Sequence, residues 1–386
     1  MLLDGAQANR SNNPWIVLLL PFAGIGIVAF SRWWGGWADA GNAAMMYAAE
    51  HPQHHLPRRM APLILLTTVA THWFGGSAGR EGTAVQMGAS LASLVQGIRR
   101  TWQPQHRQML LLAGMAAGFS GLFGTPLAAT IFALEAVRVN NRRLSAAIPC
   151  IAAALIANSV CHAWGIDHPP YPSIPIPWSW WLGPDLILLA AACAAVGGAF
   201  ILSLYGLRLL LQRITRHTLL YPFIGGCLVL GLIIVSGSQD YLGLGVMSTD
   251  PNAVTIISSF TEDGANTWSW LWKLLFTVAT VGSGFKGGEV TPLFFIGATL
   301  GNTLASFLSS PTMLLAALGM TTLFAAASKA PWACAVMTAE LFSWTLFPFA
   351  VLTCHAACML SGKHGIYAGR QPPPIANEKP TPTSPA

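Results

Sequence analysis

Long apolar runs separated by short polar loops fill most of the chain. The first run extends from Trp15 to Trp34, and aromatic residues at the two ends of a run are typical of membrane interfaces. Runs of about 20 residues with few charges predict helices that cross a bilayer. Similar apolar runs cover residues 60–74, 82–98, 144–164, 178–211, 219–236, 268–281, 289–308, 312–328 and 331–361. The pattern predicts an all-α, polytopic integral membrane protein.

Two glycine-rich breaks interrupt this pattern, GGSAGREG at residues 75–82 and GSGFKGGE at residues 282–289. Several neighbouring runs are too short to span a bilayer, which predicts helices that stop within the membrane. Glycine lets the backbone turn at such a stop and leaves the amide groups accessible. We therefore expect broken, tilted helices in place of a plain helix bundle.

The composition agrees with a membrane protein. Charged residues make up 9% of the 386 residues, whereas about 25% is usual for a soluble protein. So few charges cannot cover a water-soluble surface, and the outer surface is expected to face lipid. The composition excludes a cytosolic enzyme, a disordered scaffold and a collagen-like protein. The 38 glycines and 26 prolines exceed what uninterrupted spanning helices need.

The net charge of +6 is spread over small basic clusters between the apolar runs, such as Arg58–Arg59, Arg99–Arg100 and Arg142–Arg143. This arrangement is typical of positive-inside loops. A nucleic-acid partner would instead need a concentrated basic stripe, so we predict no nucleic-acid binding.

No metal or cofactor is predicted. The seven cysteines lie mostly in apolar runs and are odd in number, which favours reduced, packed thiols over a disulfide framework. Cys354 and Cys358 share a helix face beside His355; core packing is favoured there, and metal ligation is the alternative. The segment GSGFKG (282–287) fits a dinucleotide-binding pattern, but no strand–turn–helix unit accompanies it, so nucleotide binding is rejected.

The chain contains an internal repeat. GREGTAVQMGASL (79–91) aligns with GEVTPLFFIGATL (288–300) at an offset of 209 residues, and residues 114–135 align with residues 319–340 at an offset of 205. Each half therefore has a glycine-rich break followed by an apolar helix and a second helix that begins with proline and ends in glutamate. Paired interrupted helices at corresponding places in two halves indicate the central site of a transporter.

The repeat divides the chain into two membrane halves. The matched glutamates at the ends of the repeat, Glu135 and Glu340, are expected to bond neighbouring helices and not to carry ions. The polar start of the chain predicts no cleavable signal peptide. We expect a polar N-terminal segment at residues 1–14, a first membrane repeat at 15–177, a second membrane repeat at 178–370 and a disordered proline-rich tail at 371–386.

The two breaks place ionisable groups inside the membrane. A helix that begins there directs unpaired N–H groups and the positive end of its dipole into the interior, where an anion binds. Arg80, Glu81, Lys286 and Glu289 lie in the breaks and are functional candidates. The alternative is that these loops reach the interface and the charges are solvated. A Glu81 carboxylate could occupy the amide site itself and carry a proton, but a plain helix cap would have the same local sequence.

Three blocks resemble the CLC family of chloride channels and anion/proton antiporters, and they occur in the family's order. GREGT (79–83) resembles the G-[RK]-E-G-P block, GGEVTP (287–292) resembles the G-G-x-F-x-P block, and GTPLAATIFALE (124–135) resembles the block of the dimer-facing helices. The resemblance covers about residues 15–370. It implies a two-fold inverted repeat and a homodimer with one pore per subunit.

The resemblance also implies roles for individual residues. Glu81 corresponds to the external gating glutamate, and Glu289 is a candidate proton relay or, alternatively, a structural partner of loop amides. Phe294 and Phe295 are candidate pore aromatics, for which core packing is the alternative. The candidate anion-binding residues are Asn42, Gly79, Arg80, Gly82, Thr83, Gly288, Val290, Thr291 and Tyr367.

Departures from the family pattern narrow the resemblance to one clade of the family. Thr83 replaces the proline after GREG, and GNAAM (41–45) places Asn42 where the family has an anion-contacting serine. Glu289 enters the second block, and Ala136 stands where chloride exchangers carry an internal proton-transfer glutamate. This set of residues is similar to the fluoride/proton antiporter clade of the family.

We therefore predict a secondary active transporter, not an enzyme, that exports fluoride in exchange for protons across a bacterial inner membrane. Thr83 and Thr291 would donate hydrogen bonds to fluoride, a small anion that is strongly hydrated. The first alternative is a chloride channel or chloride/proton antiporter of the same fold. A passive fluoride channel and an intramembrane enzyme are further alternatives, although His162, His355 and Cys358 form no nucleophile–base motif.

Overall fold

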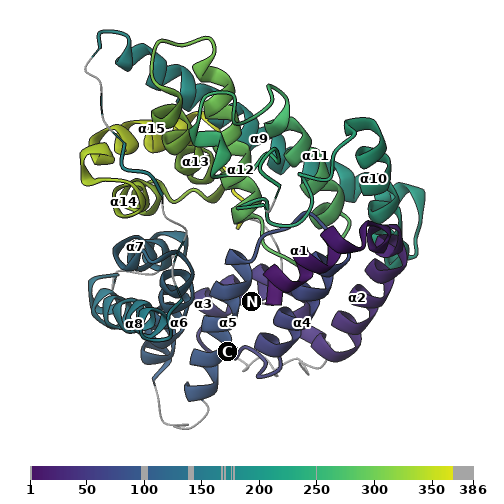
Figure 1. Ribbon diagram of the computed structural model, residues 1–386. Helices are drawn as coiled ribbons and strands as arrows, with labels where there is room; N and C mark the ends of the chain where they lie inside the picture. Colours follow the sequence, from purple (N-terminus) through teal and green to yellow (C-terminus); the bar gives the residue numbers. More distant parts are fainter. Residues whose placement is uncertain are drawn as a thin grey trace.

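Two helical bundles, one from each half of the sequence, make up the protein (Figure 1). In Figure 1 the helices α1 to α8, coloured purple to blue, lie below the helices α9 to α15, coloured teal to yellow. The structure is a computed structural model, and it describes residues 2–96, 103–137, 143–166, 168, 171–174, 176, 179–248 and 250–367.

The helices of the two halves follow the predicted apolar runs closely. The first half contains α1 (Leu2–Asn12), η1 (Pro14–Leu19), α2 (Leu20–Gly35), η2 (Gly36–Ala40), α3 (Asn42–Glu50), α4 (Met60–Trp73), α5 (Glu81–Gln96), α6 (Pro104–Phe123), α7 (Pro126–Ala136) and α8 (Arg143–Ala163). The second half contains α9 (Leu182–Ile214), η3 (Thr218–Leu220), α10 (Tyr221–Ser236), η4 (Ser258–Phe260), α11 (Ser269–Gly282), α12 (Val290–Ala305), α13 (Thr312–Ser328), α14 (Pro331–Leu341), η5 (Trp344–Leu346) and α15 (Phe347–Leu360).

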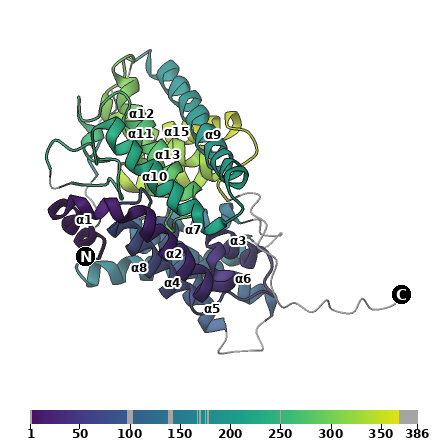
Figure 2. The same cartoon turned by 90° about the vertical axis from the view of Figure 1, so that its right-hand side faces the viewer.

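Long outer helices enclose short inner ones. Four stretches of the described chain are long and apolar enough to cross a membrane, Pro14–Glu50, Ser145–Ala163, Leu182–Ile214 and Thr218–Ser236. Among the described helices, α9 is the longest, and it packs along α13 and α15 (Figure 2). In contrast, every residue of α12 from Val290 to Asn302 is buried. The helix that begins at the second break is therefore enclosed by protein over most of its length.

Both glycine-rich breaks are loops between helices, as predicted. The first connects α4 to α5, and the second connects α11 to α12. Gly75 and Gly284, which are 209 residues apart, have φ angles of +92° and +103°. Because residues with a Cβ rarely adopt these angles, the sequence repeat is also a repeat of backbone conformation.

The repeat-matched glycines of the two breaks pair with each other. Gly79 N donates to Gly288 O, and Gly288 N donates to Gly79 O, each over 2.7 Å. An antiparallel pair that exchanges both hydrogen bonds between equivalent residues has a local two-fold axis. The two halves are thus related by a two-fold axis that passes between the breaks.

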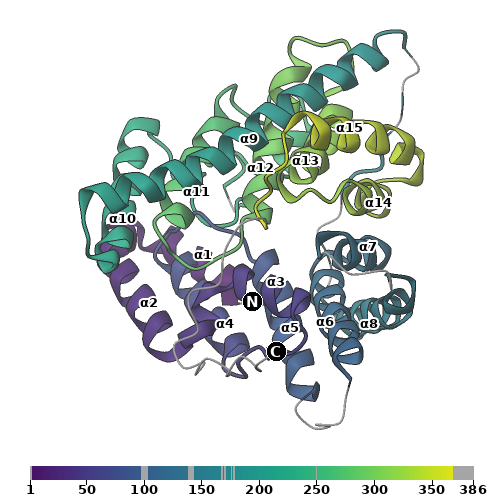
Figure 3. The same cartoon turned by 180° about the vertical axis from the view of Figure 1, so that it is seen from behind.

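The matched glutamates join the halves a second time, at α7 and α14, which face each other in Figure 3. Glu135 Oε2 accepts a hydrogen bond from Ala333 N at the start of α14 (2.9 Å). Reciprocally, Glu340 Oε2 accepts one from Ala128 N at the start of α7 (2.8 Å). The prediction that these glutamates bond neighbouring helices is confirmed.

The apolar run at residues 331–361 contains more than one helix, and the first of them agrees with the helix that the repeat predicted to end at Glu340. Residues 331–361 form α14, η5 and α15, because Ser343 has extended backbone and its side chain accepts a hydrogen bond from Thr345 N. Pro348 then occupies the first turn of α15, where proline begins a helix and cannot continue one. The predicted boundary between residues 177 and 178 and the predicted tail at 371–386 lie outside the described residues.

Candidate functional site

The side chain of Glu81 lies between the two broken helices. Glu81 begins α5, and its Oε2 accepts hydrogen bonds from Arg80 N (3.0 Å) and from Thr291 N in the first turn of α12 (3.1 Å). Only 3% of Glu81 is exposed, and Arg80 Nε lies 3.9 Å from Glu81 Oε1. The carboxylate thus occupies a site formed by backbone amides at the positive ends of two helix dipoles.

Gly79 leaves just enough space for this carboxylate. A Cβ atom on Gly79 would lie 2.6 Å from Thr291 Oγ1 and 2.7 Å from Glu81 Oε2. Both distances are too short for non-bonded atoms, so a side chain at residue 79 would expel the carboxylate or the threonine hydroxyl.

The Thr291 hydroxyl is buried and makes no hydrogen bond within the described part of the chain. Buried polar atoms nearly always have a partner, so an unpaired one at a candidate site needs an explanation. A hydroxyl can rotate to donate its hydrogen. It is therefore available to an anion that enters beside Glu81.

A small cavity of about 20 Å³ adjoins Glu81. A single water molecule needs at least about 10–15 Å³ of such volume, so the cavity suits one water or one monatomic anion. Its lining consists of Arg80, Glu81, Leu122, Phe123, Tyr171, Val246, Ile256, Thr291 and Phe294.

The two candidate aromatics point in different directions. Phe294 lines the small cavity, whereas Phe295 packs against Tyr241 and lies 5.2 Å below the ammonium group of Lys273. The sequence did not distinguish them, since adjacent residues of a helix differ by about 100° in direction.

Glu289, the residue before α12, lies on the other side of the glycine pair. Its Oε2 accepts a hydrogen bond from Asn42 Nδ2 (3.1 Å), and Asn42 Oδ1 accepts one from Gln86 Nε2. All three side chains are buried. The structure therefore brings together Asn42 and Glu289, which are 247 residues apart, and adds Gln86, which the sequence analysis did not select. The available sequence signal for Gln86 was its position as a polar residue in the second turn of an otherwise largely apolar helix.

The remaining candidates near this network have structural contacts of their own. Thr83 Oγ1 lies 3.2 Å from Thr68 Oγ1, so its hydroxyl is already hydrogen-bonded. A Cβ atom on Gly288 would lie 2.9 Å from Gly82 N, which means that these two glycines let the broken helices approach closely. Val290 is buried at the first position of α12.

Tyr367 packs edge-on against the aromatic side chain of Phe132. The ring centroid of Phe132 lies 6.1 Å from that of Phe324, which in turn lies 5.4 Å from that of Phe294. Tyr367 is not among the residues that line the small cavity or the larger one described next. An aromatic chain therefore connects it to the site indirectly.

A vestibule of about 530 Å³ opens on the side of Asn42 and Glu289. Arg32, Arg208 and Lys286 contribute to its lining together with the carboxylates of Asp39 and Glu289, so its wall carries charges of both signs. It shares no lining residue with the small cavity. The glycine pair and the first turns of α5 and α12 separate the two spaces.

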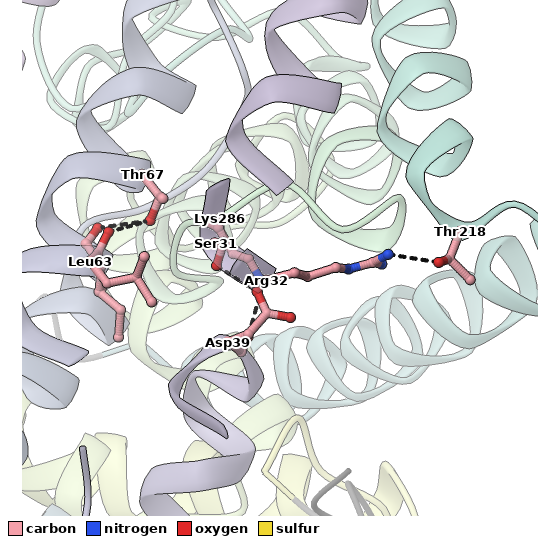
Figure 4. A network of polar contacts seen from close by, with 8 residues as sticks. Ser31, Arg32, Asp39, Leu63, Thr67, Thr218 and Lys286 are labelled. Carbon is pink, nitrogen blue, oxygen red and sulfur yellow. Dashed lines mark hydrogen bonds and ion pairs between the residues drawn. The ribbon is translucent and has the colours of Figure 1, made fainter. Parts of the chain in front are cut away.

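A polar network at the vestibule connects the second break to η2, as shown in Figure 4. Lys286 Nζ lies 2.7 Å from Asp39 Oδ1 and donates to the Asp39 backbone carbonyl (2.9 Å), while Ser31 donates to the same carboxylate. Arg32 donates to Thr218. Because Asp39 is three residues before Asn42, this network holds the segment that delivers Asn42 to Glu289.

Sequence similarity now identifies the family. Residues 22–362 match the family described as "Voltage gated chloride channel". The chain belongs to the CLC family. A chloride/fluoride channel protein of Pseudomonas syringae pv. tomato is 38% identical over 98% of this chain and 84% of its own length. The H(+)/Cl(−) exchange transporter ClcA of Cronobacter sakazakii is 26% identical over 92% of this chain and 79% of its own length.

Solved CLC structures have the same fold. A CLC-type fluoride/proton antiporter has a TM-score of 0.87 and 33% identity, with 95% of this chain and 91% of that chain covered. A slow cyanobacterial Cl⁻/H⁺ antiporter has a TM-score of 0.77 with the same coverage, and at 21% identity it shows the fold alone. The predicted polytopic CLC fold with two inverted repeats is therefore confirmed.

Proposed function

We propose that this CLC protein exports fluoride in exchange for protons and that Glu81 is its gate. The observation that carries the proposal is the Glu81 carboxylate on backbone amides of both broken helices, beside a cavity of the size of one small ion. An anion and the carboxylate would compete for these amides. Protonation removes the negative charge of Glu81 and frees the amides, so one residue couples the two fluxes.

Three features support fluoride as the anion. The buried Thr291 hydroxyl has a hydrogen to donate, and donors of this kind suit a small anion that gives up a tightly held hydration shell. The small cavity has room for one ion of about the size of water. Two similar proteins, one a chloride/fluoride channel protein and the other a fluoride/proton antiporter, have fluoride in their names.

Glu289 is proposed as the proton relay on the vestibule side. It is a buried carboxylate that faces the vestibule and accepts a hydrogen bond from Asn42. A proton from Glu81 would reach it across the glycine pair. We further propose that the protein acts as a homodimer in a bacterial inner membrane, as the family resemblance implies and as the bacterial relatives support.

Reconstitution in liposomes tests the proposal. Wild-type protein is expected to release fluoride faster than chloride and to take up protons as fluoride leaves, as recorded with a fluoride electrode and an external pH electrode. Glu81→Gln cannot exchange a proton, so proton uptake should fall to the level of empty liposomes.

Two results would contradict this scheme. Faster chloride than fluoride release would favour the chloride alternative, and fluoride release without proton uptake in the wild type would favour a passive channel. Glu262→Gln, which removes an exposed carboxylate that lies in neither break and lines neither cavity, is the matched control and should behave as the wild type.

A further inference from the structure

Two positive charges are buried behind the break that precedes Glu81. Lys273 in α11 has no exposed surface, and only 9% of Arg10 in α1 is exposed. Among the described residues no carboxylate lies within ion-pair distance of either charge. Burying a charge without a counter-ion is costly, and such residues inside membrane proteins mark functional sites.

Lys273 binds the backbone segment of residues 241–245, and the Arg10 guanidinium packs against the same segment. Lys273 Nζ donates to Tyr241 O (3.0 Å) and Gly243 O (2.8 Å). The guanidinium nitrogens of Arg10 lie 3.2 Å from the position of a Cβ atom on Gly243. Neutral carbonyl groups therefore solvate these cations and leave their net charge uncompensated.

This backbone segment touches the first break. Gly243 N donates to Gly76 O (3.2 Å), and Arg10 Nη1 donates to the carbonyl oxygen of His72 just before the break (3.0 Å). The stem of Arg10 also lies 3.5 Å from the Cβ position of Gly75. Arg10 is thus inserted between the break and the segment that Lys273 holds.

The other side of the same segment faces the small cavity. Gly245 O accepts a hydrogen bond from Ile256 N (2.9 Å), and Val246 and Ile256 both line the cavity beside Glu81. Phe295, whose ring lies 5.2 Å from Lys273 Nζ, is the neighbour of the cavity residue Phe294. The two basic side chains are therefore separated from the candidate anion site by this segment and, for Lys273, by the ring of Phe295.

We propose that Lys273 and Arg10 form a cationic pair that raises the anion affinity of the small cavity by their electric field, without contacting the anion. Their counter-charge is whichever anion occupies the amides, the Glu81 carboxylate or the transported ion. In a low-dielectric interior such a field acts over several ångströms. The two residues are positioning residues, and this inference rests on the proposed function.

Three substitutions of Lys273 separate charge from hydrogen bonding. Lys273→Arg keeps the charge, Lys273→Gln keeps a donor without the charge, and Lys273→Met removes both. We expect the KM for fluoride efflux to rise at least tenfold in the Gln and Met variants and to stay within about threefold of the wild type in the Arg variant. A wild-type KM in Lys273→Gln together with a raised KM in Lys273→Met would overturn the proposal, because hydrogen bonds alone would then explain the lysine.

Arg10 provides a second, independent test if the Lys273 variants do not fold. Arg10→Gln should raise the KM in the same direction, and Arg10→Lys should restore it; an unchanged KM in a monodisperse Arg10→Gln protein would overturn the proposal. Lys363→Gln removes an exposed charge and is the control. KM is measured for the anion that the wild type transports, so a wild type that prefers chloride would refute the proposed function while still testing the cationic pair.

Discussion

Glu81 and Glu289 both lie where a break meets its helix, but they contact different donors. Glu81 accepts hydrogen bonds from backbone amides, whereas Glu289 accepts one from the side-chain amide of Asn42. Backbone amides stay in place when the carboxylate leaves, because the helices fix them. Any small acceptor can therefore replace Glu81 on the same donors, which is the property that an exchange site requires.

A side chain at Gly79 is expected to abolish this exchange. In Gly79→Ala the new Cβ atom would lie within 2.7 Å of both Thr291 Oγ1 and Glu81 Oε2, so the carboxylate cannot stay on its amides. We expect fluoride efflux to fall at least a hundredfold in the liposome assay. Gly231→Ala is the matched control, since its Cβ would meet nothing within 4 Å, and equal losses in the two variants would refute the steric argument.

The residues of the site were partly predictable from the sequence. Asn42, Glu81 and Glu289 stand in recognisable motifs, and the repeat predicted that the two breaks would meet. Lys273 was missed because a lone lysine in an apolar run has no motif, and its role depends on the carbonyl groups of a distant segment. Tertiary packing likewise decided that Phe294 and not Phe295 lines the cavity.

At the scale of elements, reciprocal glutamates hold α7 and α14 together. Each carboxylate accepts hydrogen bonds from two successive amides of the opposite helix, Glu135 from Trp332 and Ala333 and Glu340 from Leu127 and Ala128. These contacts satisfy amides that a helix start leaves unpaired and place a negative charge at the positive dipole end. The second repeat motif is therefore a structural one.

Removing one of these caps should reduce stability without affecting coupling. Glu340→Ala is expected to cost about 1 kcal/mol, as for other helix caps, and to lower Tm by a few degrees in thermal unfolding of the detergent-solubilised protein. The double variant with Glu135→Ala should lose less than the sum, because both glutamates stabilise the same helix pair. Loss of proton coupling at normal Tm would instead indicate that these glutamates take part in transport.

Element boundaries were predictable where polar or glycine residues separate the runs. The limits of α4, α5, α10 and α13 agree with the predicted runs to within a few residues. The connection between α14 and α15 was only partly predicted: the repeat ended a helix at Glu340, but residues 341–347 remain apolar apart from Ser343 and Thr345. Its turn depends on a local serine cap that hydrophobicity does not reveal.

At the scale of the whole molecule, the two breaks pair symmetrically but differ in their access to solvent. The vestibule beside Glu289 has a volume of about 530 Å³, whereas the cavity beside Glu81 has about 20 Å³. An ion at the amides would therefore exchange with one side easily and with the other only after Glu81 moves. In this conformation the protein is open toward the vestibule.

Thiol labelling should reveal this asymmetry. In a Cys227→Ser background, a cysteine at Gln212 of the vestibule wall should react with a charged, membrane-impermeant thiol reagent applied from one side only. A cysteine at Ile256 of the small cavity should react at least a hundredfold more slowly from either side. Equal reaction rates at the two positions would contradict the difference in access.

The Gly79–Gly288 pair has a consequence for the ancestry of the chain. A contact in which each residue meets its own repeat copy is isologous, the kind found at the interface of a symmetric dimer. The protein therefore contains, within one polypeptide, the interface of two half-length chains. In a homodimer of half-length chains one substitution would change both sides of that interface, whereas in this chain a substitution at Gly79 leaves Gly288 unchanged. Joining the halves in one polypeptide therefore lets the two sides of the contact differ.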